Sequence, residues 1–296
     1  MSQIYDLGYK RYAGTRKGRG TRWTVIARNQ VSLAWKGWIR WKLAFALALI
    51  TTIVVGAILI ILGSGTFRVL EAVSGRGITI ADGIIPFTIG EFYTKCGFII
   101  ALTLGTLAIA TDIQGGAMVF YFARSVRPRD YALGKLAGYG LVVASIMLGG
   151  PLVLAALRIG LAASSGDIVN QLVILPKVLA VGVAGTLVYT AVPLAFSAIA
   201  ANKRYAVGTF AAYYLIIGGI ASVLGAVSKS PLAIIDFGNA IESFTFHLFD
   251  VQPFGRAPLL DMWAAVTSIA VFTIASIVLI FFRLREEGSA GVGGAA

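Results

Sequence analysis

Side chains that could do chemistry are few in this sequence. It has one cysteine, Cys96, and one histidine, His247, so it offers no intrachain disulfide and no cluster of cysteine or histidine metal ligands. His247 precedes Asp250 by three residues, but a histidine without companions is more often structural than metal-binding. Glu91 and Lys95 have the i, i+4 spacing at which opposite charges pair along a helix. We therefore expect no catalytic site and no metal site in this chain.

The composition is that of an integral membrane protein. Hydrophobic residues make up 58% of the 296 residues, charged residues make up 13%, and the mean hydropathy is +0.85. The first long apolar run begins only at Leu43, which is late for a secretory signal. It has the roughly 20 residues that cross about 30 Å of hydrocarbon, so we interpret it as a retained span.

Similar uncharged runs recur along the chain. They predict six transmembrane helices, near residues 43–62, 92–111, 136–157, 178–201, 206–227 and 262–282. The expected fold class is therefore an all-α integral membrane protein in which residues 43–282 form one six-span domain. An even number of spans places both termini on the same side of the membrane.

The net charge of +12 is unevenly distributed along the chain. Most basic residues lie in residues 1–42, in the loop at residues 112–135, at Lys203 and Arg204, and in the C-terminal tail. Because lysine and arginine are enriched in cytoplasmic loops, we expect both termini in the cytoplasm and a multi-pass protein of the cytoplasmic (inner) membrane. The charge then reports topology, and we expect no nucleic-acid partner.

The basic N-terminal segment, residues 1–42, contains an amphipathic pattern from Arg22 onward. At 100° per residue, the apolar residues of a helix over residues 22–40 fall mainly on one side and the polar residues on the other. A basic, tryptophan-rich helix just before a span should lie in the headgroup plane and contact membrane lipid. The residues expected at this interface are Trp23, Arg28, Trp35, Lys36, Trp38 and Arg40. The simpler alternative is a polybasic anchor to anionic lipid.

Two other regions outside the spans have distinct compositions. In the external loop at residues 228–261, three prolines (Pro231, Pro253 and Pro258) surround a dense set of aromatic and aliphatic residues, which predicts short helices at the outer interface. The tail at residues 283–296 ends in a glycine- and alanine-rich run, and we expect it to be disordered in the cytoplasm.

Asp112 is the only charged residue in residues 96–123. One interpretation is a single long helix that buries this carboxylate in the membrane, where an ionisable group usually marks a functional site. The other ends the span at Thr111 and starts a separate short helix, because Gly115 and Gly116 each weaken a continuing helix by about 1 kcal/mol. We favour the broken helix.

The broken helix leaves an apolar segment in the cytoplasmic loop at residues 112–135. An exposed apolar helix marks a contact with another protein, whereas topology alone explains the arginines beside it, and Lys135 would snorkel to the interface. Pro128 fixes a turn and ends the preceding helix. The residues expected to couple to a partner are Gly115, Gly116, Met118, Val119, Phe120, Tyr121, Arg124, Arg127, Pro128, Arg129 and Tyr131.

The same loop resembles the cytoplasmic loop of type-two ABC exporter permeases. That family typically shows an aspartate, a glycine-containing turn, an apolar stretch and then a pattern like Ser-Arg-Pro-x-Ser-Arg-x-x-Tyr-x-x-Gly-Lys. This chain departs from the pattern in having Arg129 directly after the proline and Tyr131 closer to it. The basic opening at residues 5–12 and the six-span layout with its entry helix are also similar to the family. The matching loop residues are Asp112, Gly116, Arg127, Pro128, Tyr131, Gly134 and Lys135.

This resemblance implies a transmembrane subunit that pairs with a second copy of itself and binds two cytoplasmic ATP-binding cassette ATPase subunits. The loop at residues 112–135 would supply the coupling helix, residues 22–40 the connecting helix, and residues 228–261 the external helices. The chain lacks the phosphate-binding loop Gly-x-x-x-x-Gly-Lys-Ser/Thr. We therefore expect no ATPase activity and no bound cofactor in this chain, with ATP and Mg bound by the partner ATPase.

Two other functions are alternatives. A self-contained secondary transporter or channel would line its pathway with Glu91, Lys95 and Asp112, but the sequence has no detectable internal repeat of the kind many such transporters show. A membrane-embedded enzyme would need a cluster of histidine, cysteine or carboxylate side chains. The few charges in the spans favour an amphiphile, a lipid or a hydrophobic peptide as substrate over a highly charged solute.

Overall fold

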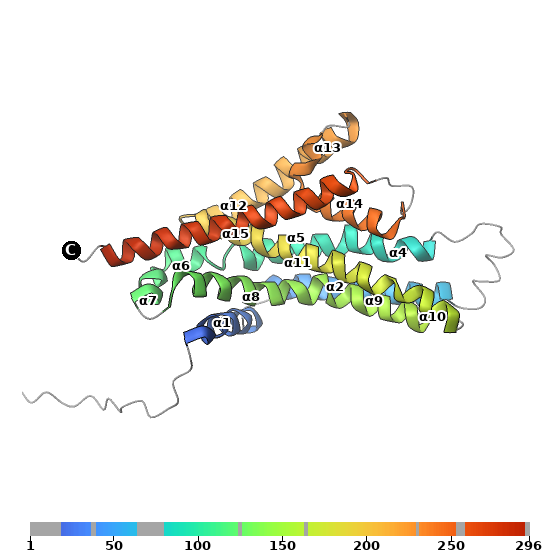
Figure 1. The fold of residues 1–296 in the computed structure, drawn as a ribbon, viewed down its shortest axis with the longest axis horizontal. Helices are drawn as coiled ribbons and strands as arrows, with labels where there is room; N and C mark the ends of the chain where they lie inside the picture. Colours follow the sequence, from blue (N-terminus) through green and yellow to red (C-terminus); the bar gives the residue numbers. More distant parts are fainter. Residues whose placement is uncertain are drawn as a thin grey trace, which may run out of the picture.

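The computed structural model describes residues 19–36, 40–63, 80–123, 126–162, 165–228, 231–252 and 258–293. These residues form helices, turns and short connections, and the long helices run side by side (Figure 1). The α-helices are α1 (Arg22–Lys36), α2 (Arg40–Gly63), α4 (Ile80–Thr88), α5 (Thr94–Ile100), α6 (Ala110–Gln114), α7 (Ala117–Ala123), α8 (Pro128–Met147), α9 (Gly149–Gly160), α10 (Ser165–Leu172), α11 (Ile174–Ile199), α12 (Lys203–Ala212), α13 (Gly219–Ser228), α14 (Phe237–Phe249) and α15 (Met262–Gly293). Between them lie the 3-10 helices η1 (Arg19–Thr21) and η5 (Pro231–Ile235) and the π-helices η2 (Ile89–Tyr93), η3 (Ala101–Gly105) and η4 (Tyr213–Gly218).

Six helical stretches are long and apolar enough to cross a membrane, as the sequence predicts. The chain is therefore an all-α, multi-pass membrane protein. The predicted starts of three spans are wrong: the second stretch begins at Gly83 instead of residue 92, because α4 continues directly into η2, the third at Pro128 instead of 136, and the fourth at Asp167 instead of 178. The six stretches are Lys42–Gly63, Gly83–Gln114, Pro128–Gly160, Asp167–Ile199, Lys203–Val227 and Met262–Glu287.

The connections gather at the two ends of the bundle (Figure 1). The helices α6 and α7, the start of α12 and the end of α15 lie at one end, with α1 beside them, whereas α4, α10 and α14 lie towards the other. We call the first the basic end, because Arg127, Arg129, Lys203 and Arg204 lie there. The second is called the opposite end. This arrangement agrees with an even number of helices that cross the membrane.

The helix α1 packs along α8, and two glycines of α8 allow the close approach. A Cβ atom at Gly134 would lie 2.6 Å from Cβ of Ile26, and one at Gly138 would lie 2.7 Å from the carbonyl oxygen of Ala27. Small residues at this spacing let two helices come together. The protein itself therefore holds one side of α1, where lipid contact was predicted. The buried residues on that side are Ile26, Ala27, Gln30 and Ala34.

The prediction of one interfacial helix over residues 22–40 is wrong in its extent. The helix α1 ends at Lys36, and Arg40 already begins α2. Gly37, a weak helix former, lies between them in the sequence, and Trp38 lies outside the described residues. The other predicted interface residues, Trp23, Arg28, Trp35 and Lys36, are all exposed.

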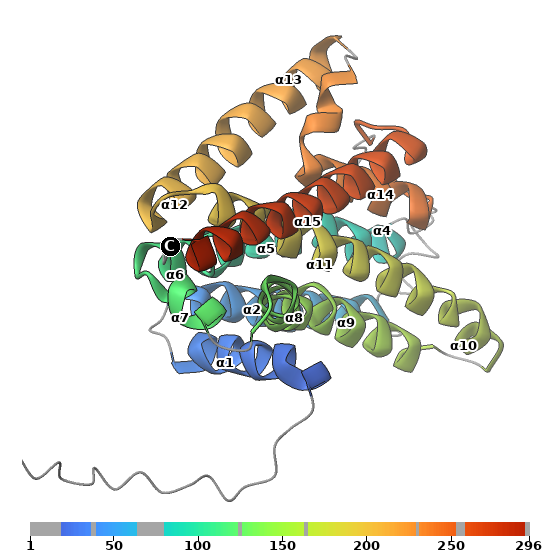
Figure 2. The same cartoon turned by 60° about the vertical axis from the view of Figure 1, so that its left-hand side comes forward.

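An aromatic cluster joins the spans around α11, and α13 diverges from the bundle beyond it (Figure 2). The rings of Phe98 and Tyr214 stack with centroids 4.3 Å apart, and those of Tyr213 and Phe237 stack at 6.2 Å. The loop at residues 228–261 contains short helices as predicted, η5 and α14.

The polar contacts of Asp236 hold the diverging helix to α14. The Asp236 carboxylate caps the first turn of α14 by accepting from the backbone amides of Gly238 and Asn239. It also accepts a hydrogen bond from the hydroxyl of Ser222 on α13, over 2.5 Å. This carboxylate therefore serves two helices at once.

The last helix, α15, extends to Gly293, so the expectation of a disordered tail over residues 283–296 is wrong for residues 283–293. The side chain of Arg283 forms ion pairs with Glu286 at 3.2 Å and Glu287 at 2.8 Å. Pairs at these spacings stabilise a helix by about 0.2–0.5 kcal/mol each.

We expect Gly138→Ala to destabilise the protein. The new methyl group would meet the backbone oxygen of Ala27, so α1 would have to shift, and overpacking of this kind costs about 1–3 kcal/mol. Gly208→Ala on α12 is the matched control, because nothing lies within 4 Å of a Cβ atom there and alanine is the better helix former by about 1 kcal/mol. Thermal unfolding in detergent should give the highest melting temperature for Gly208→Ala, an intermediate one for the wild type and the lowest for Gly138→Ala. A Gly138→Ala protein as stable as wild type would show that α1 does not rest on α8.

Candidate functional site

The loop between the second and third spans presents a short apolar helix, α7, at the basic end. Val119 and Phe120 have 60% and 75% of their surface exposed. Met118 is buried, Tyr121 is half-buried, and Tyr131 is completely buried. The predicted coupling surface is therefore smaller than the sequence indicates, because one side of α7 packs against α15 and the start of α8.

Two breaks in the second span position α7. The first is a turn at residues 106–109, where the amides of Ile109 and Ala110 donate to the hydroxyl oxygen of Ser197 on α11, over 2.9 and 2.8 Å. The second is the predicted break at the glycine pair, where Gly116 has a φ of +65°, a conformation that favours glycine. The short helix α6, which contains Asp112, lies between the two breaks.

A buried ion pair lies next to α7. The ammonium of Lys135 lies 2.9 Å from Oδ2 of Asp112, with only 6% and 20% of the two side chains exposed. The hydroxyl of Tyr131 donates to the same oxygen over 2.6 Å. Lys135 also donates to Oε1 of Gln30 on α1, at 3.0 Å, and to the carbonyl oxygen of Ala108, at 2.7 Å. We call Asp112, Lys135, Tyr131 and Gln30 the Asp112 cluster.

The position of Lys135 corrects the sequence interpretation. A lysine at the mouth of a span was expected to snorkel to the interface, but its charge is neutralised inside the protein by Asp112. The helix α8 begins with Pro128 at its first turn, so Tyr131 and Lys135, four residues apart, lie on one face of the helix. Both side chains therefore reach the same carboxylate.

Aromatic contacts connect the exposed helix to the Asp112 cluster. The rings of Tyr121 and Phe122 lie 5.2 and 6.1 Å from the ring of Tyr131, measured between centroids. Burial, and then the nearby Asp112 carboxylate, raise the pKa of Tyr121, so its hydroxyl stays protonated at neutral pH. A displacement of α7 would thus press on Tyr131 and through it on α6, α8 and α1.

The arginines of the loop contribute less to a specific site. Arg127 and Arg129 are exposed and, with Arg22 and Asp130, line a small cavity of about 160 Å³. Arg124 lies outside the described residues. Exposed cations at this end are what the topology rule requires, so they do not by themselves indicate a ligand.

The predicted pair of Glu91 and Lys95 forms, but inside the second helical stretch and not at its start. The ammonium of Lys95, on α5, contacts Oε2 of Glu91, on the π-helix η2. The Lys95 side chain is 68% exposed, whereas that of Glu91 is 15% exposed. Burial raises the pKa of the neighbouring Glu242 on α14, and the charge of Lys95 opposes this shift. Asp112 lies on the order of 25 Å further along the helix axis, so the structure does not bring the three predicted pathway residues together.

Sequence reasoning missed Gln30 and Ser197, which both bind across helices. The pair Gly134 and Gly138 could have indicated that a helix packs on this face of α8, and Gln30 would then have been the polar residue facing Lys135. No comparable signal existed for Ser197, because a serine within a span usually bonds to its own helix.

The described residues contain no group of three or more histidine, cysteine or acidic side chains suited to a metal ion. The imidazole Nε2 of His247 lies 2.9 Å from the carbonyl oxygen of Leu260. This contact ties the end of α14 to the segment before α15.

No protein-family model matches this chain, and no curated protein is similar enough to count as a match. The class of protein is therefore the one that the fold defines: an all-α, multi-pass membrane protein with six apolar helices long enough to span a bilayer. This arrangement fits a membrane transporter in general.

Removing one member of the buried ion pair should destabilise the protein strongly. Lys135→Met leaves the Asp112 carboxylate without its counter-charge, and breaking a buried pair in this way costs about 3–5 kcal/mol. The double variant Asp112→Asn, Lys135→Met removes both charges and should recover part of that loss. Arg283→Gln, which breaks exposed pairs, should cost less than about 1 kcal/mol. Unfolding in detergent followed by circular dichroism measures all three. Equal losses for Lys135→Met and Arg283→Gln would contradict a buried pair.

Proposed function

We propose that this chain is the transmembrane permease subunit of a type-two ATP-binding cassette exporter in the cytoplasmic (inner) membrane. The observation that carries the proposal is α7, which exposes Val119 and Phe120 at the basic end while Tyr121 rests on a buried ion-pair cluster. An exposed apolar helix outside the spans supports a protein contact, and a helix seated in a groove is a recurring way of making one. The resemblance of the loop at residues 112–135 supports an ATPase subunit as the partner.

Two ATPase subunits and a second copy of the chain complete the proposed transporter. ATP and Mg are bound by the ATPase, because this chain lacks the phosphate-binding loop, and the chain is not an enzyme on its own. Closure of the ATPase pair on ATP moves α7. Tyr121 and Phe122 pass the movement to Tyr131, and the Asp112 cluster passes it to α6, α8 and α1.

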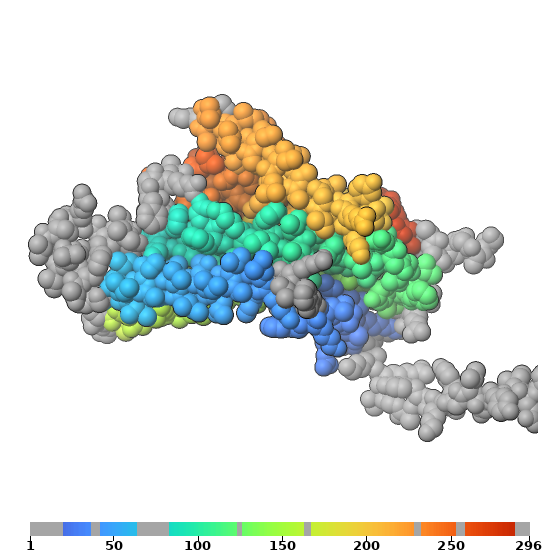
Figure 3. Space-filling model, turned by 180° about the vertical axis from the view of Figure 1, so that it is seen from behind, coloured from blue at the N-terminus to red at the C-terminus, as the bar shows by residue number. Residues whose placement is uncertain are grey.

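The proposed contact between the two copies is the face formed by α2, α5 and α13. Figure 3 shows α2, the second span and the α12–α13 helix along this face. Apolar side chains such as Ile53, Ile220 and Val223 are exposed there. Lys95 on α5 is 68% exposed within a stretch long enough to span the membrane. A lysine costs about 2.5–3.5 kcal/mol in lipid at the centre of a span, so a water-filled route between the copies is the better environment for it.

The second candidate function is a self-contained secondary transporter or channel whose pathway is lined by Glu91, Lys95 and Asp112. The exposure of Lys95 supports a polar route in this case as well. Asp112, however, is held by Lys135 and Tyr131 at the basic end. The exporter is the better supported of the two, because it uses both the exposed helix α7 and the exposed lysine.

Phe120→Asp should abolish co-purification with the proposed ATPase partner, which we expect to be encoded beside this gene, while leaving the membrane fold intact. Phe120 is 75% exposed, so the substitution costs the folded chain little, but a carboxylate would have to be desolvated in an apolar groove. Tyr205→Asp is the control, because this tyrosine is 67% exposed at the same end, on α12. Tyr205→Asp should reduce co-purification of the ATPase only slightly. Retained ATPase binding by Phe120→Asp, or no such ATPase gene nearby, would contradict the proposal.

Lys95 should face water in the assembled transporter. In a Cys96→Ala background, a membrane-impermeant thiol reagent should label Lys95→Cys in the complex. It should leave Leu187→Cys unlabelled, because Leu187 is a 47% exposed apolar side chain on α11, where we expect lipid. Equal labelling of both positions, or of neither, would mean that Lys95 does not line a polar route.

A further inference from the structure

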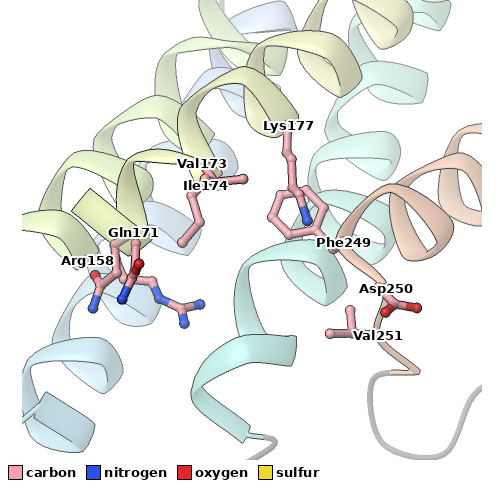
Figure 4. Close-up of a pocket in the computed structure, with 9 residues that line it drawn as sticks. Arg158, Gln171, Val173, Ile174, Lys177, Phe249, Asp250 and Val251 are labelled. Atoms are coloured by element: carbon pink, nitrogen blue, oxygen red, sulfur yellow. The ribbon is translucent and has the colours of Figure 1, made fainter. Parts of the chain in front are cut away.

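A cavity of about 450 Å³ opens at the opposite end of the bundle, where the end of α9, α10 and the start of α11 meet the end of α14. This volume lies in the range of small-molecule sites. Figure 4 shows Arg158 and Gln171 on one side of the cavity and Lys177, Phe249 and Asp250 on the other. The proposed coupling through α7 uses none of these residues.

Positive charge dominates the lining. Arg158 and Lys177 face the cavity, and Asp250 is the only acidic residue that lines it among the described residues. The ammonium of Lys177 lies 5.6 Å from the ring centroid of Phe249, a cation–π contact that holds it over the cavity and leaves its N–H donors available. Arg158 also lines the cavity, and its guanidinium carries five N–H donors. The lining therefore attracts an anion.

An unfilled hydrogen-bonding position lies in the same wall. Oε1 of Gln171 is buried and has no hydrogen-bond partner among the described residues. The oxygen and nitrogen of an amide side chain can be exchanged by a flip, so Gln171 has either an acceptor or a donor without a partner. A buried polar atom of this kind costs about 1–3 kcal/mol, which a polar ligand in the cavity would recover.

The remaining lining is apolar apart from Asn170. Val173, Ile174 and Val251 line the cavity together with Phe249. The cavity also lies near the ends of two membrane-length stretches, Pro128–Gly160 and Asp167–Ile199, which we take as the level of the lipid head groups. Cations, amides and apolar side chains at this level match the junction between a charged head group and its hydrocarbon.

We propose that this cavity binds a phosphate-ester anion, of the kind that an anionic phospholipid head group carries. Arg158 and Lys177 bind the phosphate oxygens by charge-assisted hydrogen bonds, the amide of Gln171 binds a neighbouring polar group, and Phe249 with its apolar neighbours contacts the attached hydrocarbon. Free inorganic phosphate offers the same anionic oxygens. The inference is independent of the proposed ATPase, because it concerns the other end of the bundle.

Native mass spectrometry of the full chain in detergent tests this site, with phosphatidylglycerol and phosphatidylcholine as probes. Wild type should bind phosphatidylglycerol in preference to phosphatidylcholine. Lys177→Gln should weaken phosphatidylglycerol binding by about tenfold, as expected for the loss of one charge-assisted hydrogen bond. The matched control is Lys203→Gln, since Lys203 is an exposed lysine at the basic end. The Lys203→Gln protein should bind phosphatidylglycerol with the wild-type affinity.

Asp250→Asn separates a binding effect from a folding defect. Asp250 has a φ of +56°, which asparagine tolerates, and removing the acidic charge should strengthen phosphatidylglycerol binding by about twofold to fivefold. Competition by inorganic phosphate would support the site with free phosphate as its ligand, whereas lack of competition would support a lipid head group. Equal phosphatidylglycerol affinity in wild type, Lys177→Gln and Asp250→Asn would overturn the proposal, and so would equal affinity of the wild type for the two lipids.

Discussion

The buried ion pair between Asp112 and Lys135 is the constraint on which the basic end of the bundle depends. Charges removed from water are costly unless each finds a full set of partners. The three donors of the Lys135 ammonium reach Asp112, Gln30 and the carbonyl oxygen of Ala108. Because these partners belong to α6, α1 and the turn before α6, the pair forms only when all of them lie in one arrangement. Apolar contacts between helices could slide, but this network fixes where α7 sits.

Irregular backbone supplies the geometry that the ion pair needs. Inside a membrane protein every freed backbone group must find a partner within the protein, so a break in a span is stable only where another element can bind it. Ser197 does this for the turn before α6 by accepting from two amides. The glycine pair then ends α6 through the positive φ of Gly116. The loop is thus positioned from both sides, by a hydroxyl on α11 and by glycine.

The parts of this structure that could be predicted from the sequence are those that depend on local properties. Apolar run length predicted the six spans, and the glycine pair predicted the break before α7. The burial of Lys135 was not predictable in this way, because it depends on which helix covers α8, and a lysine near the end of a span snorkels by default. The start of the second span was missed because Glu91 resembles a boundary charge, whereas its pairing with Lys95 lowers the cost of placing it inside the helix.

Cations at the two ends of the bundle carry different information. The topology rule accounts for the cations at the basic end, so the presence of Arg127 and Arg129 there does not require a ligand. Arg158 and Lys177 lie in α9 and α11, near the opposite end of the bundle, where the topology rule does not ask for cations. The ring of Phe249 is a contact for Lys177, and the proposed anion in the cavity would be a further one. The proposed export of an amphiphile would need polar groups where the head group arrives as well as along its route. Lys95 and Lys177 lie in two different membrane-length stretches, Gly83–Gln114 and Asp167–Ile199, and would meet those two needs at different places.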